Sequence, residues 1–377
     1  MLPGIPPSYL RLLSTLLYAQ PTIATPLGEH LFKTGEVNSA QGQQPLIQDG
    51  VFRTPILDIG VYHVVTIGMG HPSQPIQVVL DIQEPRLFLQ SALCTTELCT
   101  HSPHPGFDEA ASDSFVSSQQ AYRLAFSGAW FIGNISDDTL AIGGVDIPHQ
   151  SFLDAREVTL VAWYAIYGGF DGVLGLAPGT EDTNPQFPSP WRTLVSGERL
   201  HRNIFSIVLP SRFSGDGELI LGDVSDGFDE EASTQLKLVE AEDRAWVTSL
   251  ESMSFGEEDE KFEDATVLFQ LDSPMVLPSR WAQAIVDTVG MPFDCEKRKD
   301  LPVLKLGMGG TEVRLDGFDY SVEMEEPGGE KSVCVVPVRP SDDWGDGLST
   351  VILGRTFLER FRVVFAPEES LIMLERL

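Results

Sequence analysis

The chain has 377 residues, of which 42% are hydrophobic and 21% charged, a globular balance that excludes a wholly disordered chain. Its 25 basic and 55 acidic residues give a net charge of −30, which argues against nucleic acid and against an anionic membrane surface as partners. No apolar run reaches the length of about 18 residues that a spanning helix needs, so no transmembrane segment is expected.

The first 19 residues resemble a short secretory signal peptide. Leu12–Ala19 is mostly apolar and follows Arg11, and Ala19 is small enough to precede a cleavage site. The alternative is a disordered or loosely docked tail. Residues 20–49 are polar and are interrupted by Pro and Gly, and we interpret them as a short N-terminal, pro-like segment.

Short apolar runs separated by Gly and Pro predict a mostly β chain. The predicted strands are Tyr62–Ile67, Ile76–Leu80, Phe205–Leu209, Leu219–Leu221, Thr266–Leu271 and Val363–Phe365. Two helical patches, Trp191–Val195 and Ser279–Val289, interrupt them. The acidic stretches Asp223–Glu231 and Gly256–Asp264 are predicted to be solvated loops.

Four cysteines allow three disulfide pairings. Cys94 and Cys99 are close in sequence, and Cys295 and Cys334 lie far away, so pairing within each half is the simplest of the three. Disulfides indicate an oxidising compartment, and the Asn134-Ile135-Ser136 glycosylation sequon agrees with it. His101 and His104 lie in a Ser/Pro loop, which favours a solvated turn over a metal site, and no metal is predicted.

An internal repeat relates the two halves of the chain. Gln77–Asp81 is an apolar strand that ends in an aspartate, and Gly172–Gly175 follows it with a Val-Leu-Gly triplet. Val267–Asp272 ends in the same way, and Val351–Gly354 follows. Two copies imply two similar β lobes that face each other, with each aspartate at a strand-to-loop corner near the interface.

Four further motifs occur in a familiar order: Tyr62–Gln77, Asp138–Gly144, Phe170–Pro178 and Val351–Phe365. From about residue 50 to its end the chain therefore resembles the pepsin family of aspartic peptidases. The resemblance implies an all-β fold of two pseudo-twofold lobes, residues 50–205 and 206–377, around a central cleft. It also implies Cys94–Cys99 and Cys295–Cys334 disulfides, no cofactor, a monomer, and a peptide or small-molecule ligand in the cleft.

By motif position the resemblance assigns the catalytic pair to Asp81 and Asp272. In this chemistry two carboxyl groups share one proton around a water, one acting as a base and the other polarising the peptide carbonyl. Asp287 lies in a similar local sequence but falls inside the helical pattern Ser279–Val289, so Asp272 is the better match.

The residues that follow Asp81 depart from the family, which has a hydroxyl residue, a glycine and a second hydroxyl residue there. Ile82 has no hydroxyl for the crossed hydrogen bonds between the lobes, Gln83 adds a side chain where space is short, and Glu84 adds a negative charge.

The residues that follow Asp272 depart as well. Ser273 keeps a hydroxyl, but Pro274 has no N–H to offer, and Met275 has no donor. Each lost hydrogen bond to a charged group is worth about 1.5–3 kcal/mol.

The flap over the cleft is also altered. The position of the family's flap tyrosine is occupied by Phe126, and that of its tryptophan partner by Phe88. Removing both partners of one hydrogen bond can be nearly neutral for stability, so the chain can keep the fold without this contact.

These departures favour a pepsin-fold protein that has lost ordinary peptidase activity. One alternative is an active aspartic endopeptidase with an unusual dyad. Another is a repurposed catalyst or binder of small molecules, in fungal secondary-metabolite biosynthesis, with Asp81, Glu84 and Asp272 beside an apolar wall of Phe126, Trp130 and Met275. Whether the chain is an enzyme stays open, and we expect it to be secreted or in the secretory pathway.

Overall fold

A computed structural model describes residues 50–60, 62–101, 104–160, 170–178, 187–211, 214–240, 246–325, 332–341 and 349–377. The expected signal peptide, residues 1–19, and the expected pro-like segment, residues 20–49, lie outside this range. No helix in these ranges is long and apolar enough to cross a membrane.

The N-terminal half is built from strands that turn back on one another at short intervals. They are β1 (Phe52–Asp58), β2 (His63–Met69), β3 (Gln74–Asp81), β4 (Leu87–Gln90), β5 (Val116–Phe126), β6 (Ala129–Ile142), β7 (Val145–Leu160) and β8 (Gly172–Gly175). The short helices are α2 (Glu97–His101), η2 (Glu109–Ala111) and α3 (Pro190–Ser196).

The C-terminal half is also mostly strand. Its strands are β9 (Phe205–Val208), β10 (Gly217–Leu221), β11 (Thr234–Lys237), β12 (Val247–Phe255), β13 (Glu258–Phe269), β14 (Met275–Pro278), β15 (Leu304–Met308), β16 (Thr311–Leu315), β17 (Val322–Glu325), β18 (Ser332–Val335), β19 (Val338–Ser341), β20 (Ser349–Leu353), β21 (Phe361–Ala366) and β22 (Leu371–Arg376). Its helices are α4 (Ser279–Val289), η3 (Cys295–Asp300), α5 (Gly317–Tyr320) and α6 (Arg355–Leu358).

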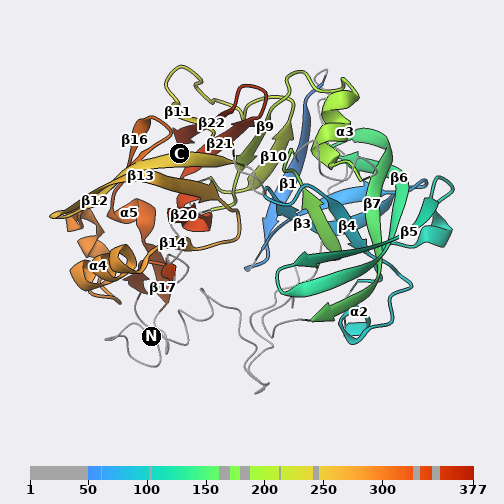
Figure 1. Ribbon diagram of the computed structural model, residues 1–377, viewed down its shortest axis with the longest axis horizontal. Coiled ribbons are helices and arrows are strands. Elements are labelled where there is room, and N and C mark those ends of the chain that lie inside the picture. Colours follow the sequence, from blue (N-terminus) through green and yellow to red (C-terminus); the bar gives the residue numbers. More distant parts are fainter. Residues whose placement is uncertain are drawn as a thin grey trace.

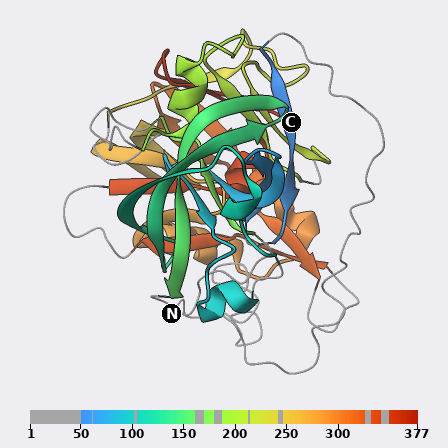
Figure 2. The same ribbon diagram turned by 90° about the vertical axis from the view of Figure 1, so that its right-hand side faces the viewer.

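These strands form one sheet that runs through both halves and two that lie in the second half. The largest has 13 strands in the order β11-β22-β21-β9-β10-β1-β2-β3-β8-β4-β7-β6-β5, and the next has seven, β16-β15-β12-β13-β20-β14-β19. Strands β17 and β18 form a separate pair. Figure 1 shows the two halves side by side, and in Figure 2 the green strands of the first half lie in front of the orange strands of the second.

The predicted repeat is present in the hydrogen-bond pattern. Strand β3 pairs in parallel with β8, which pairs antiparallel with β4, which pairs in parallel with β7. Strands β13, β20, β14 and β19 repeat the same four-strand arrangement with the same directions. The expected all-β, two-lobed architecture is therefore confirmed.

The glycine at the end of each repeated triplet has a steric reason. A Cβ atom added to Gly175 would lie 2.1 Å from the carbonyl oxygen of Glu84, and one added to Gly354 would lie 1.8 Å from that of Ser273. Each glycine therefore lets the loop that carries an aspartate pass against the neighbouring strand, which no larger residue permits.

Most predicted elements match the observed ones, and helix α4 has the predicted bounds. The prediction that Gly256–Asp264 is a loop is wrong, because strand β13 begins at Glu258 and pairs with β12. The acidic side chains of this stretch are mostly exposed, so it carries no apolar alternation, and the backbone ladder rather than burial holds the strand.

Both disulfides close within one half of the chain. Cys94 pairs with Cys99 beside helix α2, and Cys295 pairs with Cys334, which joins η3 to β18. The predicted local pairing is therefore confirmed.

Candidate active site

Asp81 and Asp272 lie at matching corners of the two lobes. Asp81 is the last residue of β3, and Asp272 follows the end of β13 by three residues. The two carboxyl groups are close enough that the negative charge of Asp272 raises the pKa of Asp81. The repeat thus brings together two acids that are far apart in the sequence.

The Asp81 carboxylate is held by its own loop. Its Oδ1 accepts the backbone N–H of Gln83 at 2.6 Å and that of Glu84 at 2.7 Å. Burial raises the pKa of Asp81 to about 6, helped by the charges of Asp272 and Glu84 and opposed by the two N–H groups. Asp81 can therefore hold a proton under mildly acidic conditions.

The Asp272 carboxylate is held from the opposite lobe. Its Oδ1 lies 2.9 Å from the backbone nitrogen of His63 and 2.6 Å from the ring Nδ1 of the same residue. Burial raises the pKa of Asp272, but the hydrogen bonds from His63 and the charge of Arg355 oppose that rise. Within the described chain, Asp272 accepts no hydrogen bond from its own loop.

His63 and its neighbour Tyr62 were not predicted from the sequence as site residues. His63 is the first residue of β2, and its side chain is fully buried. A histidine in an otherwise apolar strand was the signal that could have indicated it, but only the fold brings β2 to Asp272.

A glutamine makes the link between the lobes that hydroxyl groups were expected to make. Gln83 Nε2 donates to the carbonyl oxygen of Phe269 at 2.8 Å. This bond joins the loop that follows Asp81 to the strand that precedes Asp272. The Ser273 hydroxyl turns back instead and donates to the carbonyl of Pro274 at 2.9 Å. The crossed hydrogen bonds are therefore replaced by a one-sided contact.

Glu84 does not join the aspartates as a third free carboxylate. Arg86 binds it through Nε and through Nη2, the latter at 3.0 Å, and Arg86 Nη1 also donates to the Tyr122 hydroxyl at 2.9 Å. The guanidinium offsets part of the negative charge, but Glu84 still helps to raise the pKa of Asp81.

The expected apolar wall is not formed, since its three residues point in different directions. The Phe126 ring packs edge-on against Phe88 at 5.4 Å, whereas Trp130 lies on the opposite face of the β5–β6 hairpin beneath Arg123, 3.6 Å from the guanidinium carbon. Met275 is only 3% exposed and belongs to the core. Phe126 of β5 opposes Ala129 of β6, so Trp130, the next residue of β6, points to the other face of the hairpin.

The tip of this hairpin is held by a tyrosine from the floor of the site. The Tyr62 hydroxyl lies 2.6 Å from Ser127 Oγ. Burial raises the pKa of Tyr62, the hydrogen bond to Ser127 opposes that rise, and the charges of Asp272 and Asp81 add to it. A phenol is therefore present near the pair, but it comes from the residue before β2 and not from the flap.

An ion pair crosses between the lobes next to the site. Arg355, the first residue of α6, binds the Asp58 carboxylate of β1 and donates from Nη1 to the carbonyl of Gly60 at 2.9 Å. Its side chain also binds Glu359 at 2.7 Å. Arg355 thus ties the two lobes together where its charge reaches Asp272.

Other predicted residues lie away from the pair. His104 Nδ1 lies 3.1 Å from the buried Asp171 carboxylate, so it is not merely solvated, and no group of acids, His and Cys in the described ranges could hold a metal. Asn134 is half-buried in the middle of β6, and Asp287 is exposed on α4.

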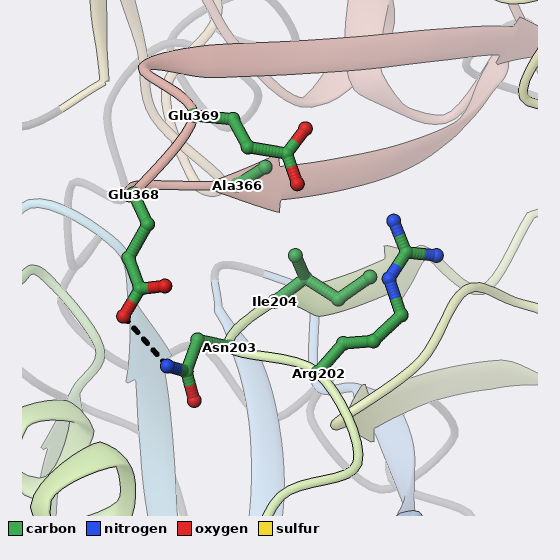
Figure 3. Close-up of a pocket in the computed structure, with 6 residues that line it drawn as sticks. All are labelled: Arg202, Asn203, Ile204, Ala366, Glu368 and Glu369. Carbon is green, nitrogen blue, oxygen red and sulfur yellow. Dashed lines mark hydrogen bonds between the residues drawn. The ribbon is translucent and has the colours of Figure 1, made fainter.

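A surface pocket near the interlobe strands is a structural feature separate from the site. It is lined by Arg202, Asn203, Ile204, Ala366, Glu368 and Glu369 (Figure 3). Asn203 donates to Glu368 at 2.6 Å, and Arg202 is paired with Glu230 at 2.5 Å. Arg202 and Glu368 thus each have a partner in the structure.

Comparisons with known proteins agree with this geometry. The model of the family described as eukaryotic aspartyl protease matches residues 62–376. The chain is 25% identical to the vacuolar aspartic protease of Candida albicans, over 86% of this chain and 78% of that protein. It is 26% identical to cathepsin D of Chionodraco hamatus, over 79% of this chain and 77% of that protein.

Proposed function

Because the chain belongs to the eukaryotic aspartyl protease family, we propose that it binds a peptide or a small molecule at the Asp81–Asp272 pair with little or no ordinary peptide-bond hydrolysis. In this proposal the lobes comprise residues 50–205 and 206–377, and the ligand lies between them.

The observation that carries this proposal is the unequal support of the two aspartates. Asp81 accepts two N–H groups from its own loop, whereas Asp272 is bound by His63. Hydrolysis by such a pair requires each carboxyl group in turn to take up and to release a proton. A hydrogen bond that favours ionised Asp272 opposes every step in which Asp272 must be protonated.

The energy of the hydrogen bond to Asp272 can be converted into an expected loss of catalytic rate. A hydrogen bond to a charged group is worth about 1.5–3 kcal/mol, which corresponds to a rate loss of about 10- to 160-fold. The flap supports a further loss, since Phe126 packs on Phe88 and has no hydroxyl to offer a substrate.

One observation favours a second function, acid–base catalysis on a small molecule. The pKa of Asp81 is raised to about 6, so this carboxyl group can both give and accept a proton at mildly acidic pH. A role of this kind in fungal secondary metabolism stays a prediction, and an isolated gene without biosynthetic neighbours would argue against it.

The cellular setting is part of the proposal. Two disulfides are typical of an oxidising compartment, and relatives of this chain are named as vacuolar proteases, so we place it in the secretory pathway as a monomer.

The test is digestion of acid-denatured globin and of a peptide library by the full chain, with and without pepstatin, read by mass spectrometry. We expect no pepstatin-sensitive cleavage. Cleavage that pepstatin blocks, that Asp81→Asn and Asp272→Asn both abolish, and that the surface variant Asp287→Asn retains would establish an active endopeptidase and overturn the proposal.

A further inference from the structure

His63 touches the aspartate pair at two points. Its backbone N–H and its ring Nδ1 both meet Oδ1 of Asp272, at 2.9 and 2.6 Å. Its side chain is fully buried, and its Nε2 has no hydrogen-bond partner among the residues that the structure describes.

The unpartnered Nε2 determines where the ring carries its proton. If Nε2 were protonated, a buried N–H donor would be left without an acceptor, and a doubly protonated ring would add a buried positive charge to this cost. With the proton on Nδ1, only a lone pair at Nε2 is left unpaired. The ring is therefore a donor to Asp272, whose Oδ1 then accepts two N–H groups.

Among the charged groups around this contact, the positive one favours ionised Asp272. Arg355 on α6 is the positive group that faces Asp272, and its own partners are Asp58 on β1 and Glu359. The other acids are Asp81 on β3, whose pKa the charge of Asp272 raises, and Glu84, which Arg86 binds. The Tyr62 hydroxyl is directed to Ser127.

We propose that His63 is a positioning residue that donates from Nδ1 to Asp272 and keeps it the ionised member of the pair, so that the shared proton resides on Asp81. The proposal rests on the proposed function only in treating these two aspartates as the site. The tests of this proposal measure the protonation of His63 and of the aspartates and need no turnover. The His63 proposal can therefore fail while the proposed function holds, and the proposed function can fail while the His63 proposal holds.

The first test is nitrogen NMR of the imidazole rings in the full-length wild-type chain, with the His63 signals assigned by their loss in His63→Asn. We expect protonated Nδ1 and unprotonated Nε2. A proton on Nε2 would overturn the proposal.

The second test is carbon NMR titration of labelled aspartate carboxyl groups, with Asp81→Asn and Asp272→Asn used to assign the pair. We expect Asp272 to titrate below Asp81 in the wild type. In His63→Leu the titration of Asp272 should move up by about one pH unit or more, because the donor is lost.

His63→Asn is the matched control, since its amide nitrogen can occupy the position of Nδ1 and restore the donor. It should leave the titration of Asp272 close to that of the wild type, which a merely space-filling role of His63 would not predict. An Asp272 titration above that of Asp81 in the wild type, or one unchanged in His63→Leu, would overturn the proposal.

Discussion

Asp81 and Asp272 are the same residue type at matching strand ends, but different groups shift the pKa of each carboxyl group. Burial raises the pKa of both, but Asp81 has only neutral N–H donors and negative neighbours, whereas Asp272 has His63 and Arg355. Because like charges in one buried site resist joint ionisation, the acid that lacks the His63 donors and the facing charge of Arg355 is the one that keeps the proton.

The raised pKa of Asp81 has a consequence for stability. The native chain binds this proton up to about pH 6, whereas the unfolded chain releases it near 3.8, so folding stability falls as pH rises through this window. Asp81→Asn removes the ionisation and can still accept the two N–H groups. We expect it to raise the free energy of unfolding at pH 7 by about 2–3 kcal/mol.

Unfolding in denaturant at several pH values measures this effect. The gain should vanish below pH 3.8, where Asp81 is protonated in both states. For Asp287→Asn, on the exposed side of α4, the change in unfolding free energy should not vary across the pH range. A gain in Asp81→Asn that did not depend on pH would contradict the assignment of the raised pKa.

At the scale of elements, the β5–β6 hairpin shows how a flap can be kept without its usual hydroxyl. Phe126 opposes Ala129 across a two-residue turn, Ser127-Gly128, in which both residues have positive φ. Such turns suit tightly connected antiparallel strands. The phenyl ring packs inward, and the Tyr62 hydroxyl binds the turn from below.

The contact between Tyr62 and Ser127 should therefore restrain the tip of the hairpin. Because the bond is exposed, we expect its loss in Tyr62→Phe or Ser127→Ala to weaken local stability by about 0.5–1 kcal/mol, and the double variant to add little. The measurement is amide hydrogen exchange at Gly128 and Ala129, which should become about 2- to 5-fold faster.

Tyr122→Phe provides the control, since Tyr122 lies on the same hairpin but binds Arg86 instead. Exchange at the tip should not change in this variant. Additive effects in the Tyr62→Phe, Ser127→Ala double variant would mean that the two hydroxyl groups do not act together.

At the scale of the whole molecule, a few side chains join the lobes around the pair. Gln83 reaches the carbonyl of Phe269, His63 reaches Asp272, and Arg355 reaches Asp58 and Gly60. The 13-stranded sheet, which contains strands from both halves, holds the lobes in the register that these contacts need.

Among these contacts, the ion pair of Arg355 allows a clear test. Arg355→Leu leaves the Asp58 carboxylate and the Gly60 carbonyl without their partner, and we expect a loss of about 1–3 kcal/mol in unfolding free energy. It should also move the titration of Asp272 upward, because the positive charge that lowers its pKa is gone.

Arg314→Leu is the matched control, because the exposed side chains of Arg314 and Glu312 pair with each other on β16, within one lobe. A surface pair of this kind should cost no more than about 0.5 kcal/mol and should not affect Asp272. Equal losses in the two variants would show that the interlobe position of Arg355 contributes nothing special.

The fold could be predicted from local patterns because the repeat carries its own steric signature. A strand that ends in aspartate and a triplet that ends in glycine each occur twice. The glycines are required because the backbone carbonyls of Glu84 and Ser273 lie where a Cβ atom on either glycine would clash. The acidic strand at Glu258 could not be predicted, since its pairing with β12 leaves no pattern of buried residues.

By itself the sequence determined the two lobes, the aspartate at each corner, the local disulfides and the missing hydroxyl groups, because each of these depends on residues that are near one another in the chain. Only the tertiary structure decided what replaced those groups. His63, Arg355 and Gln83 reach the site across the lobes, Arg86 binds Glu84, and Met275 lies in the core. Contacts between distant strands leave no trace in local spacing, and they set the charge on each aspartate.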